Sequence, residues 1–181
     1  MGQPQPPPDP LSDPTVKSFF DTLGANVGVQ RQIRLTLLAI QNAVLANDPA
    51  ANERFVALQS ITASSSNVAF YKGLAGQITA AQASVARGDT GGQPVLNFQN
   101  AIGVQASAVL DQHDQLVVVR DKTVAIAPDQ ATATANAAAV TAALAKVHTN
   151  ATGDTNPFFT QLPTLQAQAA AAVAALAPVA G

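Results

Sequence analysis

Apolar residues recur every three or four positions along most of the chain after residue 14, the spacing of one face of an α-helix. A clear run is Ile33, Leu37, Ile40 and Val44. The pattern predicts helices over residues 14–46, 49–86, 95–126 and 130–149, and a final helix that begins near Pro157 or Pro163. The only run that leans towards β-structure, Leu116–Val119, lies within a helical pattern and has no partner strand nearby, so we predict helix there too.

Two places interrupt this regular spacing. In the first helix, a step of six residues separates Val27 from Ile33, and Gly24 and Gly28 flank it, so we expect a kink or a restart there. In the second helix, the central run 62–66 is rich in serine and poor in helix-forming residues, so the helix can bend there.

Short breaks separate the predicted helices. Asp13 followed by Pro14 is a favourable start for the first helix, because aspartate caps a helix and proline fits its first turn. The other breaks are Asn47-Asp48-Pro49, the glycine-rich loop Arg87–Pro94, Ala127-Pro128-Asp129 and the loop 150–157. Short connections favour antiparallel neighbours. We therefore predict one domain over residues 15–181: an all-α, up-and-down antiparallel bundle of four main helices plus a shorter C-terminal helix.

The first 14 residues hold six prolines, at positions 4, 6, 7, 8, 10 and 14. Proline fixes φ and removes a backbone donor, so we predict a disordered proline-rich leader over residues 1–14 that forms an extended tether. It serves either as a spacer, the interpretation we favour, or as a docking peptide for an aromatic groove. Because Met1-Gly2 leads directly into this run, the start resembles the mature end of an exported protein, and we expect a periplasmic, cell-surface or extracellular location.

Composition narrows the possible partners. Charged residues make up 11% of the chain, against about 25% in an average soluble domain. The net charge is −2 with no basic stripe, which argues against nucleic acids and anionic membranes as partners. No stretch is long and apolar enough to predict a transmembrane segment. There is no cysteine, which excludes disulfides and thiolate chemistry.

Candidate chemistry is sparse. Asp111-Gln112-His113-Asp114 is the densest group of potential metal ligands, but the two aspartates share a helix face that His113 does not, so a metal would need help from another helix, such as His148. Tyr71, His113 and His148 are the only residues that could ligate a haem iron, and we treat them as weak cofactor-binding candidates. No nucleophile elbow, phosphate loop or dinucleotide fingerprint is present. We therefore predict no enzyme activity, no catalytic residue, no metal and no resident cofactor.

Two short motifs lie in predicted loops. Arg87-Gly88-Asp89 has the sequence of an integrin ligand, although Gly-Asp is also ordinary turn chemistry. Asn150-Ala151-Thr152 fits the acceptor pattern for N-glycosylation, which matters only in a glycosylating host. We favour the structural interpretation of the first motif.

These observations favour a non-enzymatic, exported structural or interaction protein, a component of a surface, matrix, filament or particle that contacts protein partners or itself. Low charge and an amide-rich surface suit self-association, since little repulsion opposes it. The alternative is a carrier for a small apolar ligand, or a cofactor such as haem, held between helices. Small-residue seams around Gly73, Ala75 and Gly76 could leave the cavity that such a carrier needs. A third hypothesis is an amphiphile that coats a lipid or other surface by opening its bundle.

Overall fold

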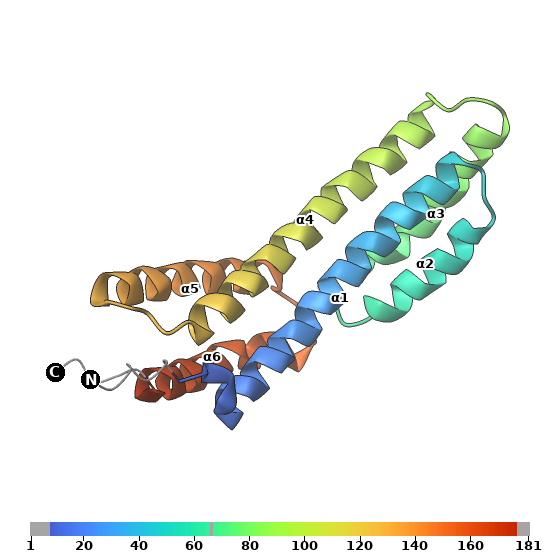
Figure 1. The fold of residues 1–181 in the computed structure, drawn as a ribbon. Coiled ribbons are helices and arrows are strands. Elements are labelled where there is room, and N and C mark those ends of the chain that lie inside the picture. The colour runs from blue at the N-terminus through green and yellow to red at the C-terminus, as the bar shows by residue number, and fades with distance from the viewer. Residues whose placement is uncertain (1–7, 66, 177–181) are drawn as a thin grey trace, which may run out of the picture. The chain divides into compact units, whose positions relative to one another are not determined.

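The computed structural model describes residues 8–65 and 67–176, and this part of the chain contains helices and no strand (Figure 1). The elements are a 3-10 turn, η1 (Pro10–Ser12), and the six α-helices α1 (Pro14–Leu45), α2 (Ala50–Ile61), α3 (Val68–Ala86), α4 (Gln93–Val124), α5 (Gln130–Asn150) and α6 (Pro157–Leu176). The all-α prediction is confirmed, and the β-leaning run near residue 116 is helical. None of the described helices combines the length and the apolar character needed to cross a bilayer.

The start of α1 follows from the predicted cap. The Asp13 carboxylate accepts hydrogen bonds from the backbone N–H groups of Thr15 and Val16, at 2.8 and 3.1 Å. Asp9 caps the preceding 3-10 turn in the same way, through the N–H of Leu11. The prediction of an extended leader is therefore wrong for residues 10–12, while residues 1–7 of that leader lie outside the described residues.

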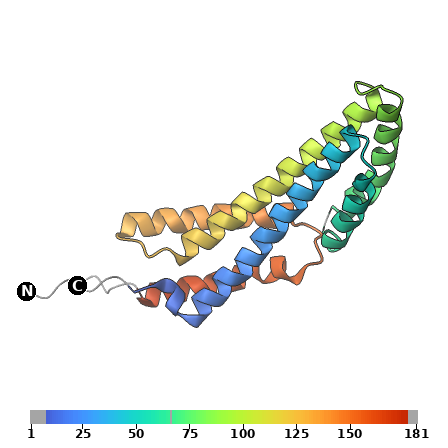
Figure 2. The same cartoon turned by 45° about the vertical axis from the view of Figure 1, so that its right-hand side comes forward.

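The predicted second helix is in fact two helices, α2 and α3, which lie side by side (Figure 2). The helix breaks at Thr62, a poor helix former whose hydroxyl donates back to the Leu58 carbonyl at 2.8 Å. The Ser64 carbonyl accepts a hydrogen bond from the N–H of Thr155 at 2.9 Å. A donor 91 positions away in the sequence thus bonds to the Ser64 carbonyl, which in a continuous helix would accept a hydrogen bond from the helix itself. The count of four main helices is wrong for this reason, and the shortest helix is α2 rather than the C-terminal one.

The end of α1 is the predicted Asn-Asp-Pro break. Asn47 has a positive φ of 52°, which asparagine tolerates better than most residues. The N–H of Asp48 bonds to the Ala43 carbonyl at 2.8 Å and that of Asn47 to the Val44 carbonyl at 3.1 Å. These two bonds form a Schellman motif, which satisfies the last carbonyls of the helix.

The described residues fall into two compact units that both draw on α1 and α4. The middle unit comprises residues 28–113 and 150–156, and the terminal unit comprises the remaining described residues. The first boundary lies directly after Val27, which packs on the core of the terminal unit, whereas Ile33 belongs to the core of the middle unit. The six-residue step therefore marks a change of core along a continuous helix, and the restart predicted there is wrong.

The core of the middle unit is built from α1, α2, α3 and α4. Its large, fully buried side chains are Leu37, Ile40, Leu58, Tyr71, Leu74, Ile78, Phe98 and Ile102. Leu37 and Ile40 belong to the run whose helical spacing predicted a buried face. Each of these four helices turns one face towards that core. The opposite faces are therefore the surfaces that a partner can reach.

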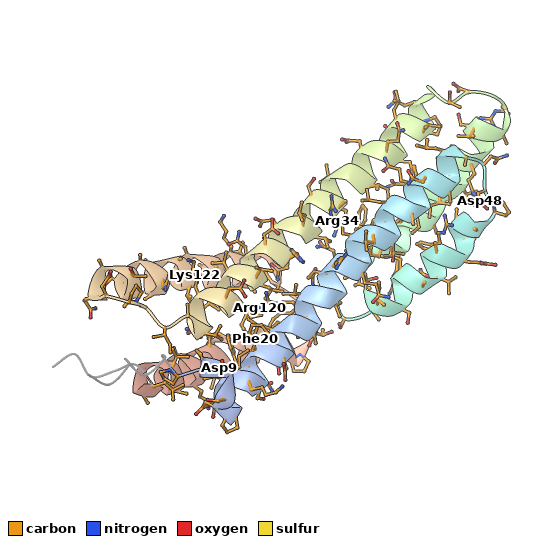
Figure 3. All side chains as sticks on the ribbon, in the orientation of Figure 1. Asp9, Phe20, Arg34, Asp48, Arg120 and Lys122 are labelled. Atoms are coloured by element: carbon orange, nitrogen blue, oxygen red, sulfur yellow. The ribbon has the colours of Figure 1, made fainter. Side chains whose placement is uncertain are left out.

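The core of the terminal unit is smaller. It contains Phe19, Leu23, Leu116, Val119, Ala143, Val147, Phe158, Leu162 and Ala169. The Arg120 guanidinium of α4 lies over the Phe20 ring of α1, 4.8 Å from its centroid (Figure 3). Helix α6 begins at Pro157 and continues through Pro163, so the first of the two predicted starts is confirmed.

Candidate functional site

Tyr71, one of the three weak cofactor candidates, lies buried in α3 within the middle core. Its hydroxyl accepts a hydrogen bond from the Gln105 amide nitrogen at 2.8 Å, and its ring meets Phe70 edge-on at 5.4 Å. Burial raises the pKa of Tyr71 to about 12; the Gln105 bond lowers it and the nearby Asp154 carboxylate raises it. The phenol therefore stays protonated at neutral pH, which disfavours the phenolate that iron ligation requires.

The two histidines belong to different units of the chain. His113 is half-buried on α4 in the middle unit, and His148 is exposed in the last turn of α5 in the terminal unit. Asp111 and Asp114 are both exposed, as their shared helix face predicts. Within residues 8–65 and 67–176, no group of three or more histidine or acidic side chains is placed to hold a metal ion.

The Arg87-Gly88-Asp89 sequence forms the end of α3. Gly88 has a φ of +81°, and the N–H groups of Asp89 and Gly88 bond to the carbonyls of Ser84 and Val85, at 3.1 and 2.8 Å. This is again a Schellman motif. The buried Ser84 hydroxyl also donates to the Asp89 carbonyl and carboxylate, at 3.0 and 3.2 Å. The tripeptide thus has a structural explanation in the fold.

The glycosylation pattern also lies at a helix end. Asn150 is the last residue of α5, and its side-chain nitrogen, the atom that would carry a glycan, donates to the Asp111 carboxylate at 3.0 Å. This bond ties residues 150–156 to α4 within the middle unit.

The small-residue seam of α3 does not pack against another helix. Gly73, Ala75 and Gly76 are all exposed. A methyl group added at Gly73 or Gly76 would meet nothing within 4 Å. The cavity between helices that these small residues could have left therefore does not arise there.

A more distinctive surface lies on the outward face of α4 in the middle unit. We call it the α4 stripe and define it by six exposed residues: Leu96, Asn100, Gly103, Val104, Ser107 and Leu110. Three of them are large aliphatic side chains, with exposed fractions of 49% for Leu96, 64% for Val104 and 37% for Leu110. The opposite face of the same helix carries Val95, Phe98, Ile102 and Val109 into the core. This part of α4 thus exposes three large aliphatic side chains, together with the polar Asn100 and Ser107, opposite its buried apolar face, whereas the exposed face of a surface helix is normally polar or charged.

The α4 stripe is also free of charge. No Asp, Glu, Lys or Arg occurs from Thr90 to Leu110, and the first acidic residue after it is Asp111. The stripe can therefore be covered by a partner without removing an ion from water, which would otherwise oppose association. Helical spacing alone did not predict this exposed face. The available signal was the seven-residue spacing of Leu96, Gly103 and Leu110 inside an uncharged run.

Comparison with known proteins gives no further guide to function, because no family model, curated protein or solved structure matches the chain.

Proposed function

We propose that the protein is a non-enzymatic structural or interaction protein that associates with a second copy of itself through the α4 stripe. The observation that carries the proposal is an uncharged, solvent-exposed helix face with three large aliphatic side chains. Large aliphatic side chains that gather on an exposed, uncharged surface are typical of interaction sites. Low overall charge and an amide-rich composition also fit an exported component of a surface, matrix or particle. We therefore propose that the protein is exported and has such a structural role.

The spacing of the stripe suits a two-fold pair. Leu96 and Leu110 lie seven residues before and after Gly103, so the three share one line along the helix, about 21 Å long over this stretch. When two copies of α4 cross antiparallel at Gly103, Leu96 of each copy faces Leu110 of the other. Such an isologous contact uses the same surface twice and closes as a dimer.

Gly103 provides the room for this crossing. A methyl group added there meets nothing within 4 Å, so the backbone of α4 is open to solvent at this point and a second helix can approach it. Helix axes approach more closely where small residues meet, and that improves van der Waals contact along the stripe. One helix face is small compared with a standard interface, so we expect a weak, concentration-dependent dimer.

Light scattering coupled to size-exclusion chromatography over a concentration series tests the proposal. We expect the average mass to rise from monomer towards dimer as concentration increases. Val104→Asp places a charge in the stripe and should hold the protein at monomer mass. Val56→Asp is the matched control, because Val56 on α2 is also 64% exposed but lies outside the stripe. A monomer at every concentration, or equal effects of the two variants, contradicts the proposal.

A second candidate function is a carrier for a small ligand. The observation that favours it is an open groove between α1 and α2 in the middle unit, lined by apolar side chains and two arginines. This groove, rather than the glycine seam of α3, is the place where the structure offers a ligand both apolar and polar contacts.

A further inference from the structure

The groove on the outer side of α1 and α2 has a volume of about 450 Å³ and opens to solvent. Its apolar part is formed by Gly28, Leu35, Ala39 and Ala57. Leu35 is 53% exposed, which leaves much of an aliphatic side chain in contact with water. Small-molecule sites range over about 300–1,000 Å³, so the groove has room for a single small molecule.

The polar part of the groove is cationic. Arg31 from α1 and Arg54 from α2 line it, and no carboxylate does. Glu53 is exposed on α2 but is not a lining residue, and α1 has no acidic residue from Thr22 to its end. In the part of the chain that the structure describes, no ion pair joins Arg31 or Arg54 to a carboxylate. The local charge is therefore positive in a chain whose net charge is −2.

Arg54 is held in position across the groove. One of its terminal nitrogens donates to the Ala39 carbonyl on α1 at 3.0 Å, so the guanidinium reaches from α2 to the neighbouring helix. A guanidinium has five N–H donors, and this bond uses one of them. The planar group can still present a pair of parallel donors to a carboxylate, its preferred bidentate partner.

We propose that this groove binds one anionic amphiphile, a linear carboxylate with an aliphatic tail. The carboxylate pairs with Arg54, and the tail lies along Leu35, Ala39 and Ala57. An uncharged apolar molecule fits less well, because it would cover two guanidinium groups without pairing them. Haem fits less well, because no histidine, tyrosine, cysteine or methionine lines the groove to ligate its iron.

This inference rests on the second candidate function, the carrier, and does not depend on the α4 stripe. The test is isothermal titration calorimetry of the full chain with dodecanoate, below the concentration at which it forms micelles. We expect one site per chain. We expect dodecanol, which has the tail without the charge, and acetate, which has the charge without the tail, each to bind at least tenfold more weakly.

Variants locate the site. Arg54→Gln should weaken dodecanoate binding about tenfold, equivalent to about 1.4 kcal/mol, whereas Arg54→Lys should lose less because the charge remains. Arg87→Gln, at an exposed arginine in the loop after α3, is the matched control and should change nothing. Leu35→Asn should weaken binding, and Leu96→Asn, at a leucine of similar exposure, should not. Far-UV circular dichroism checks that each variant keeps its helices.

Three results would overturn the inference. The first is no binding of dodecanoate, including the case in which the protein binds only anionic phospholipid vesicles or only acidic peptides. The second is equal binding of dodecanol and dodecanoate. The third is binding that Arg54→Gln and Arg87→Gln affect equally. Because Leu96→Asn should disrupt the proposed dimer and leave the groove intact, failure of the dimer and failure of the groove give different results.

Discussion

Tyr71 allows a quantitative test of the middle core, because it is the only tyrosine and the chain has no tryptophan. Burial raises its pKa from 10.0 to about 12. That difference corresponds to about 2–3 kcal/mol in favour of the protonated form in the folded chain. The ultraviolet absorbance of tyrosinate therefore reports one site, and we expect its titration in the native protein to have a midpoint near 12 rather than near 10.

The raised pKa also determines how stability depends on pH. Below pH 10 the phenol is protonated in both the folded and the unfolded chain, so its full contribution to the free energy of unfolding is present. Between pH 10 and 12 the unfolded chain releases this proton and the folded chain does not, so stability falls by about 2–3 kcal/mol across that window. Above the folded value no further loss occurs, because both states are ionised.

Tyr71→Phe separates this effect from the titration of lysines. At pH 7 the variant should be about 1–3 kcal/mol less stable, because the buried amide of Gln105 loses its acceptor. By pH 12 that difference should shrink to zero or change sign, since phenylalanine has no proton to lose. Urea unfolding of both proteins at several pH values provides the comparison. A native titration midpoint near 10, or a difference that stays constant from pH 7 to 12, would refute the assigned environment of Tyr71.

Two further substitutions test the fold against matched controls. Gly88→Ala should lower stability by about 1–2 kcal/mol, because alanine disfavours the φ of +81° at the end of α3, whereas Gly91→Ala, with open space and no positive φ, should be nearly neutral in thermal unfolding. Leu58→Ala should lower the free energy of unfolding, measured in urea, by about 2–5 kcal/mol, because the side chain is fully buried. Val56→Ala, on the exposed face of α2, should lower it by less than about 0.5 kcal/mol. Similar losses at both positions would contradict the described core.

Helical spacing predicted most of the helices, because the buried face of a helix places apolar residues every three or four positions along the sequence. Leu37, Ile40 and Val44 are buried as their spacing requires. Spacing is less informative where alanine replaces larger residues: in α5, Ala143 is buried and Ala137 is exposed. Alanine occurs on buried and exposed helix faces alike, so its spacing carries little information.

Features that depend on distant partners were missed. The break between α2 and α3 involves a hydrogen bond from Thr155 to Ser64, and no local signal reveals that pairing. The burial of Tyr71 likewise depends on Gln105, 34 residues further along the chain. The candidate surfaces were missed for a related reason. Spacing shows that a helix has an apolar face, but tertiary structure decides whether a second apolar face, such as the α4 stripe, remains exposed.

The most direct test of the proposed self-association is a disulfide at the crossing point. The chain has no cysteine, so Gly103→Cys introduces a single thiol at a position that should meet itself in the two-fold pair. Helices packed about 8–10 Å apart bring facing Cα atoms within the distance of about 4–7 Å that a disulfide spans. Gly73→Cys, at an exposed glycine on α3, is the matched control. Under mild oxidation we expect Gly103→Cys to form a covalent dimer much faster than Gly73→Cys; equal rates, or no dimer from Gly103→Cys, would contradict association through the α4 stripe.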